Sequence, residues 1–327
     1  MSDWRFDLVP APPPGTKATG FVDWRDPVVV GWEFPYVAVN GAEAGPAALV
    51  IAGIHGSEYV SIDAAVRLGA ALDPSAVRGQ VLCLPLLNPA AFWERTAFVS
   101  PIDNLNPNRA FPGKPLGSFT ERLAHRLTER AIRHADALVD LHGGDVPEAL
   151  LAFTIYEQTG DSALDGRSRA MAEAFGMPAM LGQPPGNSPI AGTTYSTAAR
   201  LGVAAVIAED GGAGVYDADA AQRLLAGTEN ALRAVGVLPG DVRPMPAPTR
   251  YGRFVWVRTA LAGFFKPSVR VGDVVAEGAM LGTIGDFFGR TVETVVAASA
   301  GRVLFLTISA AVKADGLICG IGAGAAA

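Results

Sequence analysis

Three short motifs place polar residues beside glycines at points where buried strands are expected to end. His55 and Glu58 follow the apolar run in "VIAGIHGSE". His142 ends the run in "VDLHGG", and Glu209 ends the run in "VIAEDGG". Ligands of open α/β sheets bind beyond the carboxyl ends of the strands, and glycine lets the backbone turn sharply there. Because the chain has only 4 histidines, two of them at such positions indicate a shared functional site.

The residue types at these positions are those of a zinc hydrolase. Two histidines and one glutamate are the protein ligands of catalytic zinc sites that keep one position open for water. We therefore expect His55, Glu58 and His142 to bind one Zn²⁺ ion. Zinc lowers the pKa of water to about 7 and polarises a carbonyl group, so a further carboxylate must take up the proton. Glu209 is the expected base, and its neighbour Asp210 is the rival for that role.

Each motif also has an ordinary structural interpretation. A histidine and a glutamate three residues apart at a helix start are usually surface residues. His142 alone fits a hydrogen-bonded histidine in a turn, and Glu209 alone fits a helix cap or a salt bridge. Three strand-end motifs in one chain nevertheless favour a metal hydrolase. Asp140, two residues before His142, would then orient a ligand imidazole, and the ligand set also accepts divalent ions other than zinc.

A loop rich in proline and asparagine, "SPIDNLNPNRAFPG", contains the pair Asn108 and Arg109. Arginine binds a carboxylate through two parallel hydrogen bonds, which lysine cannot reproduce. A surface arginine in a capped turn is the ordinary interpretation of such a loop. Beside a zinc site, the pair instead predicts a clamp for an acidic group of the substrate.

Apolar runs and amphipathic segments predict the elements that position these residues. Buried strands are expected where short apolar runs lie between turn residues, at residues 27–39, 47–54, 79–88, 136–142, 148–156 and 202–210. Helices are expected at residues 58–72, 117–135 and 217–236, the second with a capping box formed by Ser118 and Glu121. Strands that alternate with helices predict an α/β fold with a mixed, largely parallel sheet flanked by helices.

The composition changes at "PGDVRPMPAPTR", where four prolines in twelve residues mark a linker. Beyond it, short β-type runs are broken by Gly-Asp and Glu-Gly turns, and no helix is expected. We therefore predict two units. Residues 1–240 form a zinc-dependent catalytic α/β domain with an N-terminal arm, and residues 241–327 form a linker and a small C-terminal all-β domain.

The overall composition excludes several classes of protein. Apolar residues make up 50% of the 327 residues, enough for a sizeable core. The net charge of −6, without a basic cluster, argues against a nucleic-acid partner. No run approaches the roughly 20 apolar residues of a membrane helix, and the N-terminus lacks the apolar centre of a signal peptide. With two cysteines in apolar runs, these features predict a cytoplasmic protein, and homo-oligomerisation is left open.

The motifs together resemble the succinylglutamate desuccinylase/aspartoacylase family, a branch of the zinc carboxypeptidase fold. The resemblance rests on "GIHGSE", "NPNRAFPG", "DLHGG" and "AEDGG", which occur in the order that the family shows. It implies that His55, Glu58 and His142 bind zinc. It also implies that Glu209 activates the attacking water and later protonates the leaving amine.

By the same resemblance, Asn108 and Arg109 would hold a substrate carboxylate, but their loop departs from the family's pattern. Many members carry an arginine shortly before the "PxD" of this loop to polarise the scissile carbonyl, and here the nearest candidate is Arg95. The loop reads "NPNR" where "DLNR" is commoner. The C-terminal part is similar to biotinyl/lipoyl modules, yet Glu293 stands in the turn where these carry a modified lysine, so no attached cofactor is expected.

We therefore expect a zinc-dependent amidohydrolase that removes a short acyl group from an N-acylated amino acid or a similar small carboxylate. A carboxypeptidase-like peptidase with the same site is the first alternative. A non-catalytic protein that binds a metal or a small molecule is the second. The β domain favours a restricted cleft and a small substrate, and specificity is expected to depend on loops such as residues 182–195.

Overall fold

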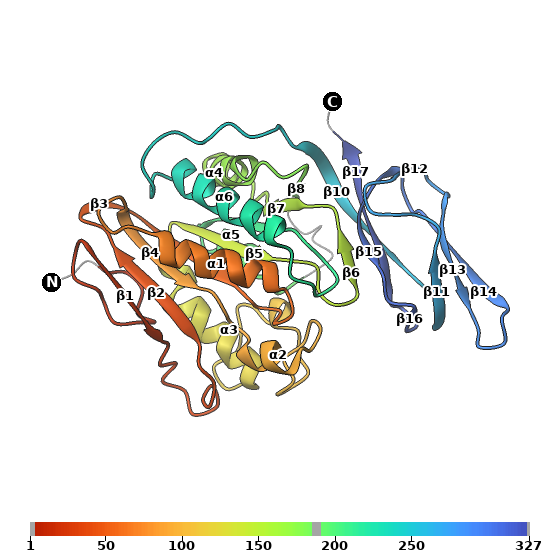
Figure 1. Ribbon diagram of the computed structural model, residues 1–327, viewed down its shortest axis with the longest axis horizontal. Helices are drawn as coiled ribbons and strands as arrows, with labels where there is room; N and C mark the ends of the chain where they lie inside the picture. Colours follow the sequence, from red (N-terminus) through yellow and green to blue (C-terminus); the bar gives the residue numbers. More distant parts are fainter. Residues whose placement is uncertain (1–3, 185–190, 326–327) are drawn as a thin grey trace.

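The computed structural model describes residues 4–184 and 191–325, and its framework is a 13-stranded mixed sheet (Figure 1). The strands from the first part of the chain are β1 (Thr16–Phe21), β2 (Pro35–Asn40), β3 (Glu43–Ala52), β4 (Arg78–Leu84), β5 (Ala137–His142), β6 (Glu148–Leu150), β7 (Phe153–Glu157), β8 (Ala179–Gln183) and β9 (Ala204–Glu209). Across the sheet the order is β1-β2-β4-β3-β5-β9-β7-β8. Strands β4, β3, β5 and β9 run parallel, which confirms the predicted mixed, largely parallel sheet.

The apolar runs of the sequence form the centre of this sheet. The last six residues of β3 and all residues of β5 are buried, as expected for strands that are covered on both faces. Cys83 and Cys319 are buried free thiols. Within the described ranges, no helix has the length and apolar content needed to cross a membrane.

Helices cover both faces of the sheet (Figure 1). They are α1 (Tyr59–Ala71), α2 (Pro89–Glu94), α3 (Phe119–Arg130), α4 (Ser162–Ala174), α5 (Thr194–Arg200) and α6 (Ala218–Ala234), with two short 3₁₀ turns, η1 (Pro107–Arg109) and η2 (Ile132–His134). Side chains of α1, α4 and α6 share one hydrophobic cluster with the sheet. Side chains of α3 and α5 lie in the cluster on the opposite face.

The C-terminal part of the chain is all β and continues the same sheet. Its strands are β10 (Thr249–Arg258), β11 (Gly263–Pro267), β12 (Val274–Val275), β13 (Met280–Gly285), β14 (Thr291–Val296), β15 (Gly301–Thr307), β16 (Ala311–Val312) and β17 (Leu317–Ala325). β10 pairs in parallel with β8, whereas β14, β13, β11 and β16 form a second, 4-stranded sheet. Residues 249–325 contain no helix, as predicted. The domain division at residue 240 stays a prediction, and strand pairing connects the two sides of it.

The structure differs from the predicted elements where pairing rather than apolar pattern forms a strand. β1 lies in the N-terminal arm, for which the sequence predicts no element, and its alternating exposed residues are held by antiparallel pairing with β2. The predicted strand at residues 148–156 is two strands, because β6 pairs with β15 while β7 pairs with β9. The helix predicted to extend to residue 135 ends at Arg130. Its capping box is confirmed, with the Ser118 N–H donating to Glu121 Oε2 at 3.0 Å.

Two glycines allow the chain to turn between β3 and α1. Gly53 has a φ of 63°, in the left-handed region that side chains other than glycine rarely adopt. Gly56 lies against the first turn of α2, where a Cβ atom would be 2.1 Å from the Phe92 nitrogen. Because backbone atoms cannot yield as a flexible side chain can, Gly56 is needed for close packing of this turn on α2.

Gly56→Ala is expected to lower the free energy of unfolding by about 1–3 kcal/mol or more, since the added methyl group overpacks a rigid contact. Gly166→Ala is the matched control, because Gly166 lies within α4 and a Cβ atom there would meet no neighbouring atom within 4 Å. That control should stabilise the helix by up to about 1 kcal/mol. Urea unfolding measures the free energy of unfolding of both variants and of the native protein. Equal values for Gly56→Ala and the native protein would contradict the prediction.

Candidate active site

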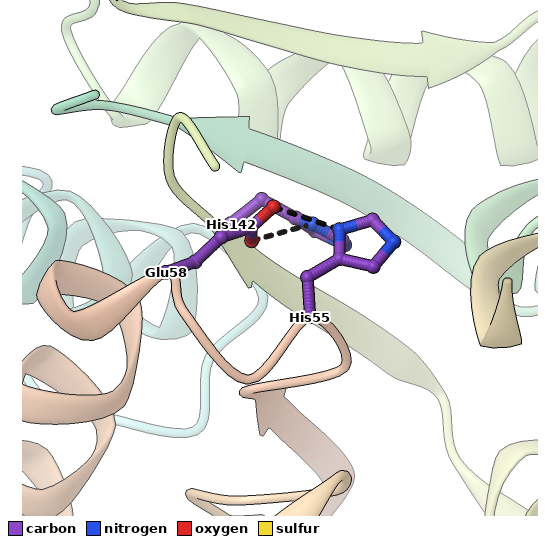
Figure 2. Close-up of side chains that lie close together, drawn as sticks. All are labelled: His55, Glu58 and His142. Carbon is purple, nitrogen blue, oxygen red and sulfur yellow. Dashed lines mark hydrogen bonds and ion pairs between the residues drawn. The ribbon is translucent and has the colours of Figure 1, made fainter. Parts of the chain in front are cut away.

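The three predicted metal ligands converge at the carboxyl ends of two neighbouring parallel strands (Figure 2). His55 and Glu58 lie in the turn from β3 to α1, and His142 is the last residue of β5. His55 Nδ1 is 2.7 Å from Glu58 Oε1, and His142 Nδ1 is 3.0 Å from Glu58 Oε2. Ligand atoms of all three buried residues lie within 4.8 Å of one another. The structure therefore brings these residues together as the sequence predicts.

The charges around this cluster favour a cation. Burial alone would raise the pKa of Glu58, but the imidazoles of His142 and His55 outweigh it and lower that pKa to about 2. Burial would lower the pKa of His142, yet the Asp140 and Glu58 carboxylates raise it well above its usual range. Two imidazole nitrogens and a carboxylate oxygen, buried among further carboxylates, are a donor set that fits a divalent ion such as zinc.

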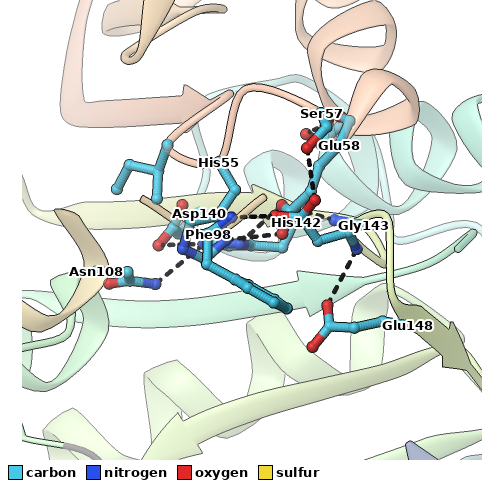
Figure 3. A network of polar contacts seen from close by, with 12 residues as sticks. His55, Ser57, Glu58, Phe98, Asn108, Asp140, His142, Gly143 and Glu148 are labelled. Atoms are coloured by element: carbon cyan, nitrogen blue, oxygen red, sulfur yellow. Dashed lines mark hydrogen bonds and ion pairs between the residues drawn. The ribbon is translucent and has the colours of Figure 1, made fainter. Parts of the chain in front are cut away.

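The far nitrogen of each imidazole contacts an oxygen acceptor. His142 Nε2 is 3.2 Å from Asp140 Oδ2 (Figure 3). His55 Nε2 is 3.1 Å from Asn106 Oδ1. Such partners fix the tautomer so that the other ring nitrogen is free to bind a metal. Asp140 is 0% exposed and also accepts a hydrogen bond from the Thr194 hydroxyl. The sequence predicts Asp140 as a residue that orients a ligand imidazole, but it does not predict Asn106. The only sign of Asn106 in the sequence is that the loop reads "NPNR" where the family more commonly has "DLNR".

Glu209 lies beside His142 in the sheet. The two residues are paired in register on β5 and β9, so their side chains leave the same face, and both line one cavity. Burial raises the pKa of Glu209 well above its usual range; His142 opposes this rise, and the carboxyl groups of Glu58 and Glu148 add to it. Asp210, the rival base, is instead bonded to Arg223 at 2.7 and 2.9 Å.

Asn108 and Arg109 reach the same cavity, but Arg95 does not. Asn108 is buried between two neighbours: its Nδ2 is 3.1 Å from His142 Nε2, and its Oδ1 accepts from the Thr194 N–H at 3.0 Å. Arg109 lines the cavity and donates to the Asn108 carbonyl at 2.6 Å. Arg95 ends α2 in a left-handed conformation, is exposed, and is absent from the described cavity lining, so the structure gives no support to Arg95 as the carbonyl-polarising residue.

A buried carboxylate holds the loop that covers His55. Asp145 accepts from the Ser57 hydroxyl at 2.5 Å and from the Phe98 N–H at 2.6 Å. These bonds tie the turn after β3 to the loop before η1, and the Phe98 ring packs edge-on against His55 with centroids 6.1 Å apart. Phe98, one of the three residues just before Pro101, therefore lines the cavity.

The cavity has a volume of about 100 Å³ and includes residues that sequence reasoning misses. Glu148, at the start of β6, lines it, and burial together with the charge of Glu58 raises the pKa of Glu148 to about 8. Side chains of β10 and β15 complete its wall. From the predicted specificity loop, Thr193 and Tyr195 line the cavity, whereas residues 185–190 lie outside the described ranges.

Comparisons with known proteins show the family of this chain. Residues 44–235 match the model of the succinylglutamate desuccinylase/aspartoacylase catalytic domain. The chain is 30% identical over 258 residues to the N-alpha-acetyl-L-2,4-diaminobutyric acid deacetylase of Halomonas elongata, a match that covers 77% of this chain and 74% of that protein.

Solved structures of similar proteins share the whole architecture. The succinylglutamate desuccinylase/aspartoacylase of Rhodobacter sphaeroides has a TM-score of 0.83 at 27% identity, with 98% of each chain covered. The product-bound ectoine utilization protein EutE (DoeB) of Ruegeria pomeroyi has a TM-score of 0.84 at 25% identity, with 98% of this chain and 100% of that chain covered. The C-terminal β part therefore belongs to the shared fold.

Asp140→Asn is expected to weaken zinc binding roughly 10- to 100-fold, because the carboxylate that raises the basicity of His142 becomes a neutral amide. Asn106→Asp is the reciprocal variant, and it should strengthen binding by giving His55 a charged partner. Competition with a chromogenic chelator measures both affinities without recourse to activity. Equal zinc affinities in both variants and the native protein would remove the support for these roles.

Proposed function

This chain belongs to the succinylglutamate desuccinylase/aspartoacylase family of amide-bond hydrolases, and we propose that it is a zinc-dependent deacylase of N-acylated amino acids or similar small carboxylates. One observation carries the proposal. The candidate ligands, the candidate base and Arg109 line one cavity, so a substrate bound there would meet the metal site, the base and the carboxylate clamp together.

In this proposal His55, Glu58 and His142 hold the zinc ion. Zinc in such a site supplies Lewis acidity, which lowers the pKa of water to about 7 and polarises a carbonyl group. Asp140 contacts Nε2 of His142, and Asn106 contacts Nε2 of His55. These contacts keep each imidazole in the tautomer whose Nδ1 is free to bind the metal.

Glu209 moves the proton in both halves of the proposed reaction. Its carboxylate takes a proton from the attacking water as the C–O bond forms, and gives that proton to the amine nitrogen as the C–N bond breaks. A carboxyl group whose pKa is raised by burial binds a proton more readily than a solvent-exposed glutamate. The in-register position beside His142 supports this role for Glu209.

Arg109 and Asn108 bind and orient the substrate carboxylate in the proposed complex. The Arg109 guanidinium supplies paired donors, and its bond to the Asn108 carbonyl fixes its direction. Asn108 is held by the Thr194 N–H, so that its amide keeps one orientation beside His142.

Glu209→Gln is expected to lower kcat roughly 10²- to 10⁴-fold, the contribution of general acid–base catalysis, while zinc content stays at the native level. Asp210→Asn is the matched control, since Asp210 follows in sequence but pairs with Arg223. That control should lose some stability and retain most of kcat. Steady-state kinetics with metal analysis tests both variants, and native turnover by zinc-loaded Glu209→Gln contradicts the assigned role.

Removal of the metal is expected to lower Tm and abolish hydrolysis together, because a ligand that binds only the folded state stabilises it. Free zinc at 100 times its Kd contributes about 2.7 kcal/mol. Thermal unfolding before and after dialysis against a chelator, with zinc added back, measures the effect. A protein that contains no metal as isolated and shows an unchanged Tm with zinc argues for a different chemistry.

A further inference from the structure

The cavity has two walls of opposite character. One carries the candidate metal ligands, the candidate base and the substrate clamp. The other is apolar and comes from four strands of the sheet, β7, β9, β10 and β15; its side chains are Phe153, Ile155, Ile207, Phe254, Trp256 and Phe305. A small-molecule site of this kind takes most of its contact area from the apolar wall and its orientation from the few polar groups.

Strand register builds the change from polar to apolar into the sheet. His142, Glu209 and Phe153 are paired neighbours on β5, β9 and β7, so they form one row on one face. The next row on the same face, two residues back on β5 and β9, contains Asp140 and Ile207. A substrate held at His142 and Glu209 therefore has apolar surface immediately beside it.

The aromatic side chains of the apolar wall support one another. The Phe254 ring lies 5.5 Å from that of Phe153 and 4.5 Å from that of Trp256, and Trp256 lies 6.0 Å from Phe305. β15 also pairs with β6, which seats Phe305 opposite Leu150. Rings packed in this way present a rigid surface that need not be ordered when a ligand binds.

The charges of the cavity provide for one carboxylate. Among its described lining residues, Arg109 is the one arginine or lysine, whereas Glu58, Glu148 and Glu209 are carboxylic acids. A second substrate carboxylate would find no second arginine or lysine among these lining residues and would lie near carboxylic acids, which weakens its binding.

The carboxyl group of Glu148 is already engaged within the protein. Its Oε2 accepts from the Asp145 N–H at 3.0 Å. Beside the aromatic wall, an ammonium group on the substrate would lose bound water without gaining a hydrogen-bond acceptor from the aromatic rings.

We propose that this site selects monocarboxylate N-acyl amino acids with an uncharged apolar substituent, which lies against the aromatic wall formed by β7, β10 and β15. The inference rests on the proposed deacylase function and narrows its substrate class. Dicarboxylic substrates, such as N-succinyl or N-acetylglutamyl compounds, are disfavoured, because Arg109 is the one arginine or lysine among the described lining residues. The apolar substituent is carried either by the amino acid or by the acyl group. A panel of substrates distinguishes these two possibilities.

The test compares kcat/KM of the zinc-loaded full chain for five compounds. N-acetyl-L-leucine and N-hexanoylglycine carry the apolar group on the amine and on the acyl side. N-acetyl-L-glutamate and N-succinylglycine are their dicarboxylic counterparts, and N-alpha-acetyl-L-2,4-diaminobutyrate is the cationic one. At least one apolar compound should exceed its charged counterparts by roughly 10-fold or more, the discrimination that a hydrophobic pocket gives.

Trp256→Ala should lower kcat/KM for the preferred apolar compound roughly 10-fold or more and change that for N-acetylglycine much less. Phe287→Ala is the control, because Phe287 is an aromatic residue of the same C-terminal part that is 90% exposed and does not line the cavity. A preference for a dicarboxylic or cationic compound, or an unchanged ratio in Trp256→Ala, overturns the inference. If the native protein hydrolyses none of the compounds, the proposed function fails; calorimetric binding of the same compounds then decides the inference separately.

Discussion

The buried carboxylate of Glu58 is the interaction on which the site depends. A carboxylate is costly to bury unless every oxygen is paired. Here one oxygen contacts His55, and the other contacts His142 and accepts from the Gly143 N–H at 3.0 Å. These contacts join the turn after β3 to the end of β5. The ligand turn, the parallel strand pair and the glycines beside them are therefore required together, since loss of any one leaves a buried charge unpaired.

The parallel sheet gives this interaction its surroundings. Parallel strands end at one edge, so residues far apart in sequence meet there, and the two-residue period of a strand decides which face each side chain takes. Asp140 and His142 share a face for this reason, and so do Ile207 and Glu209. The positioning partner of a ligand and the apolar neighbour of the base are thus consequences of the same register.

How far the sequence predicts the site follows from this geometry. Strand ends are local features, so His55, Glu58, His142 and Glu209 can be found from short apolar runs followed by glycine. Residues of irregular loops that contact the candidate ligands depend on backbone geometry, and no periodic pattern of apolar residues predicts that geometry. Asn106 is therefore not recognised from the sequence, and the loop before η1 presents Phe98 near the cavity while Arg95 lies outside its described lining.

The C-terminal part shows why the apolar wall could not be predicted from the sequence. Its Pro-rich linker and β-type runs indicate a separate unit, yet β10 joins β8 and β15 joins β6 by hydrogen bonds. Contacts between strands so far apart along the chain are set by long-range pairing and leave no local signal. The same pairing places aromatic residues of β10 and β15 beside the cavity, so a part that the sequence marks as an appendage supplies a wall of the site. A chain truncated near residue 240 would consequently expose β8 as an edge and open the cavity to water, and the enclosure that makes Glu209 a strong proton acceptor would be lost with it.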